Sequence, residues 1–197
     1  MEPVTTVSGH AIPLDRADVD TDQIIPARHL KKIERTGYGP FAFESWRKDP
    51  DFVVNRPEYA GAPILLAGPN FGGGSSREHA VWAIQQMGVE VVIAPSFADI
   101  FRNNCAKMGL LTVTLPPPDC EHLMARAMEV PDAPIRVDLS AQTVSTPDGW
   151  SRGFEIDPFV KHTLLNGLDG IDITLQHVDA IAAYERGRAA FRPRTGA

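Results

Sequence analysis

The stretch ILLAGPNFGGGSSREHAVWAIQQMGVEVVIA, residues 64–94, decides the fold class of this chain. It opens with a short apolar run at 64–67 that is typical of a buried strand. Apolar residues then recur with helical spacing over 77–87, and Gly88 ends the expected helix. The β-branched run at 89–94 indicates a second buried strand. A strand, a helix and a strand in this order predict an α/β fold.

The same pattern recurs once further along the chain. A helix is expected over 97–108, where Gly109 stops it, and a strand follows at 110–115. Beyond a helix at 119–129, apolar and polar residues alternate over 135–144, which indicates a more exposed hairpin. The sheet is therefore expected to be either mixed or doubled.

The remaining segments are a tail and a long loop. Two helices are expected over 158–166 and 175–188, and residues 191–197 are interpreted as a frayed tail. Residues 28–55 mix charged residues, glycines and aromatics without clear periodicity, which is typical of a loop. Loops of this length inside a compact domain are either functional lids or disordered. We predict that this loop is functional and that it is mobile in the free chain.

The composition excludes several classes of protein. The 197 residues include 19 basic and 25 acidic side chains, and the net charge of -6 has the wrong sign for attraction to nucleic acid. No secretory signal opens the sequence, and no apolar run approaches the ~20 residues of a membrane helix. The two cysteines, Cys105 and Cys120, lack C-x-x-C spacing and suit a reducing compartment. We therefore expect a cytoplasmic protein without a nucleic-acid or membrane partner.

The most specific chemical signal lies between the first strand and the first helix of the opening stretch. Glycines allow the backbone to approach a ligand closely, and the unsatisfied amides of a first helical turn attract anions. Serine hydroxyls and a guanidinium at the same place favour a carboxylate, which arginine binds through two parallel hydrogen bonds. The residues of this predicted anion site are Gly72, Gly73, Gly74, Ser75, Ser76 and Arg77.

Other interpretations of these residues were weighed. Ser75 and Glu78 have the spacing of a capping box, which needs no function but leaves the glycines and the arginine unexplained. A Walker loop is excluded because no Gly-Lys-Ser/Thr follows, and a dinucleotide fingerprint because Arg77 stands at its third glycine position. An esterase elbow is excluded because its second glycine is missing. His79, one turn into the helix, is interpreted as a packed histidine.

Metal sites have little support in the sequence. Asp18, Asp20 and Asp22 resemble the start of a calcium loop. However, Gln23 replaces the turning glycine, and His29 stands where the bidentate glutamate belongs. The three acids are therefore interpreted as caps or braces of a turn. The histidines show no metal-ligand spacing, and two cysteines alone cannot hold an iron-sulfur cluster.

Beyond these inferences, the chain resembles a known family over about residues 4–190. Three motifs are similar to the swivelling domain of the aconitase family: GGGSSREH at 72–79, SFADIF at 96–101 and GLL at 109–111. Three others narrow the resemblance to small subunits of isopropylmalate dehydratases: DTDQIIP at 20–26, NGLD at 166–169 and TLQ at 174–176. The resemblance implies that residues 1–190 form one three-layer β/β/α swivelling domain.

The resemblance also implies roles for individual residues. Ser75 matches the family's catalytic serine, which as an alkoxide removes a proton from a carbon next to a carboxylate. Ser76 and Arg77 match positions that bind the substrate carboxylate, and Arg35 lies near the place of another substrate-binding arginine. The implied loop that selects the substrate side chain contains His29, Leu30, Lys31, Lys32 and Ile33.

Within that loop, the side chains favour two kinds of substrate. Leu30 and Ile33 offer apolar contact to an isopropyl group. Lys31 and Lys32 leave open a substrate whose side chain carries a carboxylate.

The reaction implied by the resemblance converts 2-isopropylmalate to 3-isopropylmalate through isopropylmaleate, in leucine biosynthesis. The family's [4Fe-4S] cluster is held by three cysteines of a large subunit, and two cysteines cannot supply three ligands. We therefore expect an obligate heterodimer in which the large subunit holds the cluster, with no metal bound by this chain. Two alternatives stay open: a related hydro-lyase subunit acting on citraconate, maleate or a homoaconitate-like acid, and a noncatalytic anion-binding module.

Overall fold

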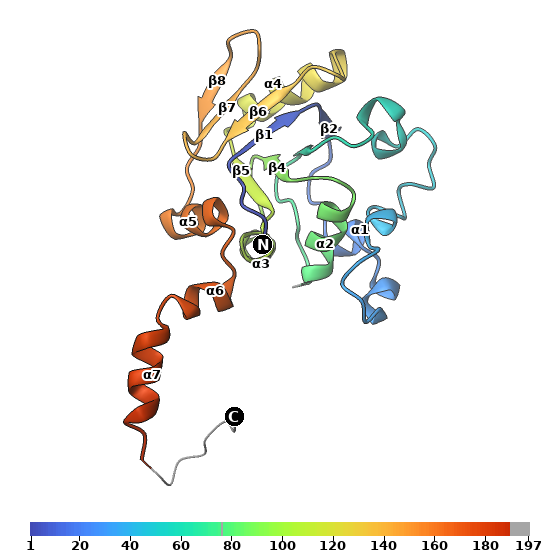
Figure 1. The fold of residues 1–197 in the computed structure, drawn as a ribbon. Helices are drawn as coiled ribbons and strands as arrows, with labels where there is room; N and C mark the ends of the chain where they lie inside the picture. The colour runs from blue at the N-terminus through green and yellow to red at the C-terminus, as the bar shows by residue number, and fades with distance from the viewer. Residues whose placement is uncertain (76, 190–197) are drawn as a thin grey trace.

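The fold is built around two separate sheets (Figure 1), and the computed structural model describes residues 1–75 and 77–189. The parallel sheet contains, in spatial order, β2 (Ala11–Leu14), β3 (Ile64–Ala67), β4 (Val91–Ala94) and β5 (Leu111–Thr114). The antiparallel sheet contains β1 (Thr6–Gly9), β6 (Ile135–Asp138), β7 (Thr143–Ser145) and β8 (Ser151–Gly153). Of the two arrangements expected from the sequence, the doubled sheet is the one that forms.

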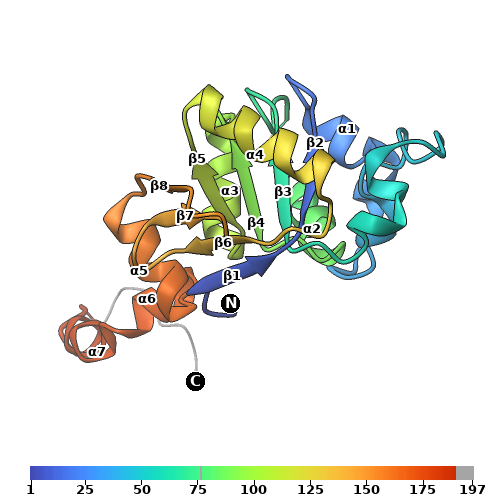
Figure 2. The ribbon, with the colours of Figure 1, turned by 90° about the horizontal axis from the view of Figure 1, so that it is seen from above.

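The parallel sheet is buried on both faces (Figure 2). Side chains such as Leu65 share one core with α2 (Glu78–Gln86) and α3 (Asp99–Met108). The alternate side chains, such as Ile64, share a second core with the antiparallel sheet and with α4 (Pro117–Glu129). Burial on both faces explains why β3 and β4 are apolar at every position. Helices, parallel sheet and antiparallel sheet are the three expected layers.

The two N-terminal strands had no counterpart in the sequence-based expectation. Residues 6–14 enter both sheets, because β1 pairs with β6 and β2 pairs with β3. Each strand has only four residues, and Pro13 lies inside β2. Proline is tolerated there because β2 is at the edge of its sheet. Local propensity therefore gives no signal for strands that form only by long-range pairing.

The C-terminal helices follow the expectation in part. The first, α5 (Pro158–Asn166), has the expected bounds. The single helix expected over 175–188 is instead a pair, α6 (Gly170–Leu175) and α7 (Val178–Arg186). Asp169 starts α6 through a capping box with Asp172, a signal that the periodicity analysis did not use. The tail expected at 191–197 lies outside the described residues.

The segment 28–55 has no α-helix or strand, as expected, but half of it belongs to the core. It contains short 3-10 turns, and a fourth one follows it: η1 (Ala27–Lys31), η2 (Gly39–Phe41), η3 (Val53–Asn55) and η4 (Pro57–Tyr59). Tyr38 and Phe43 are fully buried, and Arg16 lies 4.3 Å above the ring of Trp46. Residues 31–37, in contrast, lie largely at the surface. Among the described residues, no helix is long and apolar enough to cross a membrane.

Candidate active site

The glycine loop connects the end of β3 with the start of α2. Gly72 and Gly74 have φ values of +85° and +87°, a conformation that favours glycine. A Cβ atom on Gly72 would collide with the ring of Phe101, which reaches the loop from α3. Close packing and positive φ therefore both require glycine at position 72.

Two amides of the predicted anion site are already engaged. The N–H groups of Gly72 and Gly73 donate to the carbonyl of Val19, with N···O distances of 2.7 and 3.2 Å. These two glycines therefore shape the loop, and their amides do not point at a ligand. The positive end of the α2 dipole remains as a source of positive potential beside the loop.

The short helix α1 (Thr21–Ile24) clamps the segment that carries the predicted catalytic serine. Asp20 caps α1 with its side chain, and Thr21 Oγ1 donates to the carbonyl of Ser75 at 3.1 Å. Asp22 forms an ion pair with the guanidinium of Arg77. The acids of this turn are caps and braces, as interpreted from the sequence. Thr21, between two of them, is a contact to the serine that the sequence reasoning missed.

Ser75 is exposed on the loop and does not cap α2. The helix begins at Glu78 with Arg77 as its N-cap, and no side-chain hydrogen bond caps it. The capping-box interpretation of Ser75 and Glu78 is therefore wrong, and the Ser75 side chain is left at the surface. Ser76, which is predicted to bind the substrate carboxylate, lies outside the described residues.

A cluster of rings brings Arg35 to α2. Its guanidinium carbon lies 5.6 Å from the ring centre of Trp82, and its carbonyl accepts a hydrogen bond from Gln86 at 2.7 Å. The centre of the His79 ring lies 4.8 Å from that of Trp82 and 5.5 Å from that of Tyr38, and these two rings contact each other at 5.7 Å. Burial lowers the pKa of His79, which favours the neutral, packed histidine expected from the sequence. Arg35 thus reaches the helix that begins next to Arg77.

Glu44 holds the beginning of the predicted specificity loop. Its carboxylate pairs with Arg28 at 2.5 Å and with the ring of His29, which stacks on Phe41 at 3.9 Å between ring centres. Two hydrogen bonds lower the pKa of Glu44: the larger effect comes from Arg28 and the smaller from His29. The start of the loop is therefore anchored by the contacts of Arg28 and His29 with Glu44.

The remaining loop residues point in different directions. Leu30 packs against the core, and Lys32 donates to the carbonyl of Thr36 at 2.5 Å. Lys31 is exposed, and Ile33 is 95% exposed. Of the two apolar side chains expected to meet an isopropyl group, only Ile33 lies open at the surface.

The cysteines of this chain do not fit an iron-sulfur cluster. Cys105 and Cys120 are buried in different cores, and burial raises the pKa of the Cys120 thiol to about 11 and that of Cys105 well above its usual range. A cluster binds thiolates, which these environments disfavour. Among residues 1–75 and 77–189, no group of three or more histidine, cysteine or acidic side chains is arranged to hold a metal.

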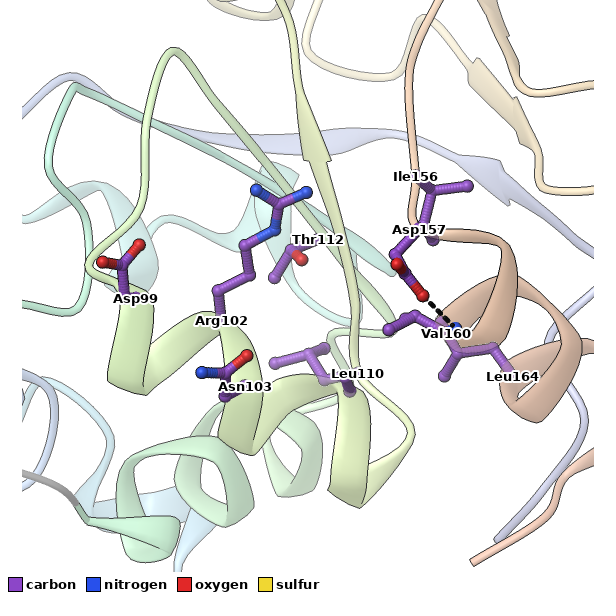
Figure 3. A pocket seen from close by; sticks show the side chains of 10 residues that line it. Asp99, Arg102, Asn103, Leu110, Thr112, Ile156, Asp157, Val160 and Leu164 are labelled. Carbon is purple, nitrogen blue, oxygen red and sulfur yellow. Dashed lines mark hydrogen bonds between the residues drawn. The ribbon is translucent and has the colours of Figure 1, made fainter. Parts of the chain in front are cut away.

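One cavity of the described chain is separate from the predicted site. This cavity of about 500 Å³ lies between α3 and α5 and is lined by Arg102, Thr112 and Asp157 (Figure 3). There Asp157 accepts hydrogen bonds from the first amides of α5 and so acts as its cap. None of the described site residues lines this cavity.

Comparison with known proteins first gives the class. Residues 1–118 match the family described as the aconitase C-terminal domain, so the chain is of the aconitase swivelling type that its motifs resemble. Residues 121–158 match a segment described as LeuD_N. Residues 171–196 match the C-terminal domain of 3-isopropylmalate dehydratase small subunits.

Individual relatives narrow the class further. The 3-isopropylmalate dehydratase small subunit of Rubrobacter xylanophilus is 56% identical over 194 residues, covering 98% of this chain and 99% of that protein. The small subunit of Acidothermus cellulolyticus is 55% identical over 197 residues, covering 100% of both. The chain belongs to the family of 3-isopropylmalate dehydratase small subunits.

A solved structure supports the fold. The 3-isopropylmalate dehydratase of Methanocaldococcus jannaschii is 26% identical, with a TM-score of 0.64. The match covers 91% of this chain and 99% of that one. The fold class expected from the sequence is confirmed.

Proposed function

We propose that this chain is the small subunit of an isomerising hydro-lyase that converts 2-isopropylmalate to 3-isopropylmalate through isopropylmaleate in leucine biosynthesis. The names of its relatives support this activity. The observation that carries the proposal is the exposed Ser75 on a rigid glycine loop, clamped by α1 and placed next to Arg77.

In the proposed mechanism, Ser75 acts as the base. Its Oγ, as an alkoxide, takes the proton from the carbon next to a substrate carboxylate, the electron pair of that C–H bond forms the double bond of isopropylmaleate, and hydroxide leaves from the neighbouring carbon. A serine hydroxyl is a very weak acid, so the anion needs electrostatic stabilisation. The N-terminal end of α2 and the guanidinium of Arg77 supply positive potential at this place. The hydrogen bond from Thr21 to the Ser75 carbonyl holds the backbone that carries the Ser75 Oγ.

Arginine side chains position the substrate. Arg77 and Ser76 are proposed to bind one carboxylate, and Arg35 a second one. In the free chain, the guanidinium of Arg77 is paired with the carboxylate of Asp22, whose side chain is 56% exposed. A substrate carboxylate that binds Arg77 through two hydrogen bonds competes with this single contact. The ion pair therefore keeps the guanidinium oriented until substrate arrives.

The specificity loop is proposed to contact the substrate's alkyl group. Ile33 supplies the exposed apolar side chain, and Glu44 holds the loop's base through Arg28 and His29. Packing of an isopropyl group against Ile33 removes apolar surface from water, and this favours binding of the branched substrate.

A large subunit is proposed to complete the site. The relatives are described as small subunits, which implies a large one. We propose that this partner holds the [4Fe-4S] cluster, since the two cysteines here lie in different cores and burial raises the pKa of both thiols. The pair would act in the cytoplasm, where both thiols stay reduced.

The test is an anaerobic assay of the chain with the cluster-loaded large subunit, following the double-bond absorbance of isopropylmaleate. Ser75→Ala is expected to lower kcat by about 10²–10⁴-fold, because a positioned base contributes about that factor. Ser151→Ala is the matched control, since Ser151 is an exposed serine on the other sheet. Its activity is expected to be unchanged.

Other outcomes of this assay select the alternatives. Faster turnover of citraconate, maleate or a homoaconitate-like acid than of isopropylmalate would assign a related hydro-lyase. Full activity of Ser75→Ala would remove the serine from the mechanism and leave an anion-binding module.

A further inference from the structure

The last two helices form an arm that projects from the body of the protein (Figure 1). We define the arm as residues 170–186, which comprise α6 and α7. Neither helix contains a buried residue. Every other α-helix of the described chain buries at least two.

The arm carries a stripe of large apolar side chains. Two of them lie four residues apart on α6, and three lie at intervals of three residues on α7, so each helix carries its apolar side chains on one face. Ile171 is 69% exposed and Tyr184 is 64% exposed, while the least exposed member is still 36% exposed. The stripe consists of Ile171, Leu175, Val178, Ile181 and Tyr184.

The area of this stripe is large for a free surface. Five such side chains present apolar surface on the order of 500 Å², near the upper end of the ~300–600 Å² patches found on monomers. One side of a standard protein interface buries ~800 Å², so the stripe could supply more than half of it.

The helices are also too short to be stable alone. Isolated helices shorter than ~12–15 residues are marginal in water, and most helical stability comes from packing an amphipathic face. Here α6 has six residues and α7 has nine. Because neither helix buries a residue in the body, their exposed apolar faces favour packing against an external surface.

The matched families indicate which surface that is. The aconitase C-terminal domain, by its name one part of a longer chain, matches only residues 1–118. All but the first residue of the arm falls in the segment that matches the C-terminal domain of 3-isopropylmalate dehydratase small subunits. A separate subunit needs noncovalent contacts to stay with its partner, and the arm lies outside the part of the chain that matches the aconitase C-terminal domain.

The arm is remote from the candidate active site. Both views place α7 at the opposite end of the molecule from α1, which clamps Ser75 (Figures 1 and 2). Contacts of the arm can therefore strengthen association without touching the substrate.

We propose that the apolar stripe of the arm docks on the large subunit of the dehydratase and holds the two subunits together. This inference rests on the proposed function, because it needs that partner. It adds the surface through which the partner is bound.

The test compares two variants of the full chain. The arm variant carries Leu175→Gln, Val178→Gln and Ile181→Gln, because glutamine is a good helix former and removes the apolar surface. The control carries Met128→Gln and Val130→Gln, which are exposed apolar residues of α4 and its end. The Kd for the purified, cluster-loaded large subunit is measured anaerobically by calorimetry.

The arm variant is expected to bind about 100-fold more weakly, since a few central side chains contribute most of the binding free energy of an interface. The control is expected to bind like the unmodified chain. At saturating large subunit, the kcat of the arm variant is expected to be unchanged. Hydrogen exchange of residues 170–186 is expected to slow only in the complex of the unmodified chain.

Three results would overturn the inference. If the arm variant binds the large subunit with unchanged Kd, the arm is not the docking surface, while the Ser75→Ala result still stands. If the variant instead loses self-association of the free chain, the stripe binds a second copy. If the unmodified chain does not bind the large subunit at all, both the inference and the proposed function fail.

Discussion

At the scale of single residues, Gly72 and Gly73 differ in what surrounds them. Gly72 has positive φ and faces the ring of Phe101, whereas no atom lies within 4 Å of a Cβ built on Gly73. We expect Gly72→Ala to lower the free energy of unfolding by about 2–4 kcal/mol, because strain and overpacking add. Urea unfolding of the free chain measures this loss.

Gly73→Ala is the matched control for that experiment. It is expected to change the free energy of unfolding by less than about 0.5 kcal/mol. Equal losses in both variants would mean that the Phe101 contact does not shape the loop.

The buried thiol of Cys120 is expected to make the folded chain less stable as the pH rises into the alkaline range. Burial raises the pKa of its thiol from the usual 9 to about 11. The folded state then binds more protons than the unfolded state, so this contribution is complete below pH 9 and is lost as the pH rises through 11. Denaturant unfolding between pH 8 and 11 is expected to show a steeper decline for the unmodified chain than for Cys120→Ala. Parallel pH profiles would contradict this.

At the scale of elements, the segment 28–55 divides into an anchored and a free part. The amide of Phe43 donates to the carbonyl of Ile24 at 2.8 Å, and Tyr38 and Phe43 are fully buried. Within the described residues, amides 33–37 have no backbone acceptor. The mobility predicted for the whole segment is thus narrowed to residues 33–37.

Hydrogen exchange of the free chain tests this division. Amides 33–37 are expected to exchange at rates close to those of an unfolded peptide, because these N–H groups donate to no backbone carbonyl of the described residues and the segment is held only by side chains that bind the carbonyls of Arg35 and Thr36. Amides of residues 41–47 are expected to be protected. Strong protection of 33–37 in the free chain would mean that the loop is already closed.

At the scale of the whole molecule, the chain is expected to have no isomerase activity alone. Its described residues contain no group of three or more histidine, cysteine or acidic side chains arranged to hold a metal. Turnover is expected to rise with added large subunit and to saturate at one equivalent. Isomerisation by the isolated chain, free of large subunit by mass spectrometry, would refute this expectation.

The sequence by itself determined the strand–helix–strand unit at 64–94, and the resemblance of its motifs to a known family implied the three-layer class. Strand and helix periodicity are local, and the GGGSSREH string at 72–79 is specific without any contact. The same local signals placed α5 at its observed bounds.

Only the tertiary structure decided how these parts meet. The strands β1 and β2 lack the uninterrupted apolar runs of β3 and β4, because β1 is half polar and Pro13 interrupts β2. Pairing with distant partners stabilises both strands. Thr21 reaches Ser75 and Asp22 reaches Arg77 across 54 and 55 residues of sequence. The amides of Gly72 and Gly73 were expected at a ligand, but the nearby Val19 carbonyl takes both. Contacts between residues so distant in sequence depend on the folded path of the chain, which no local pattern contains.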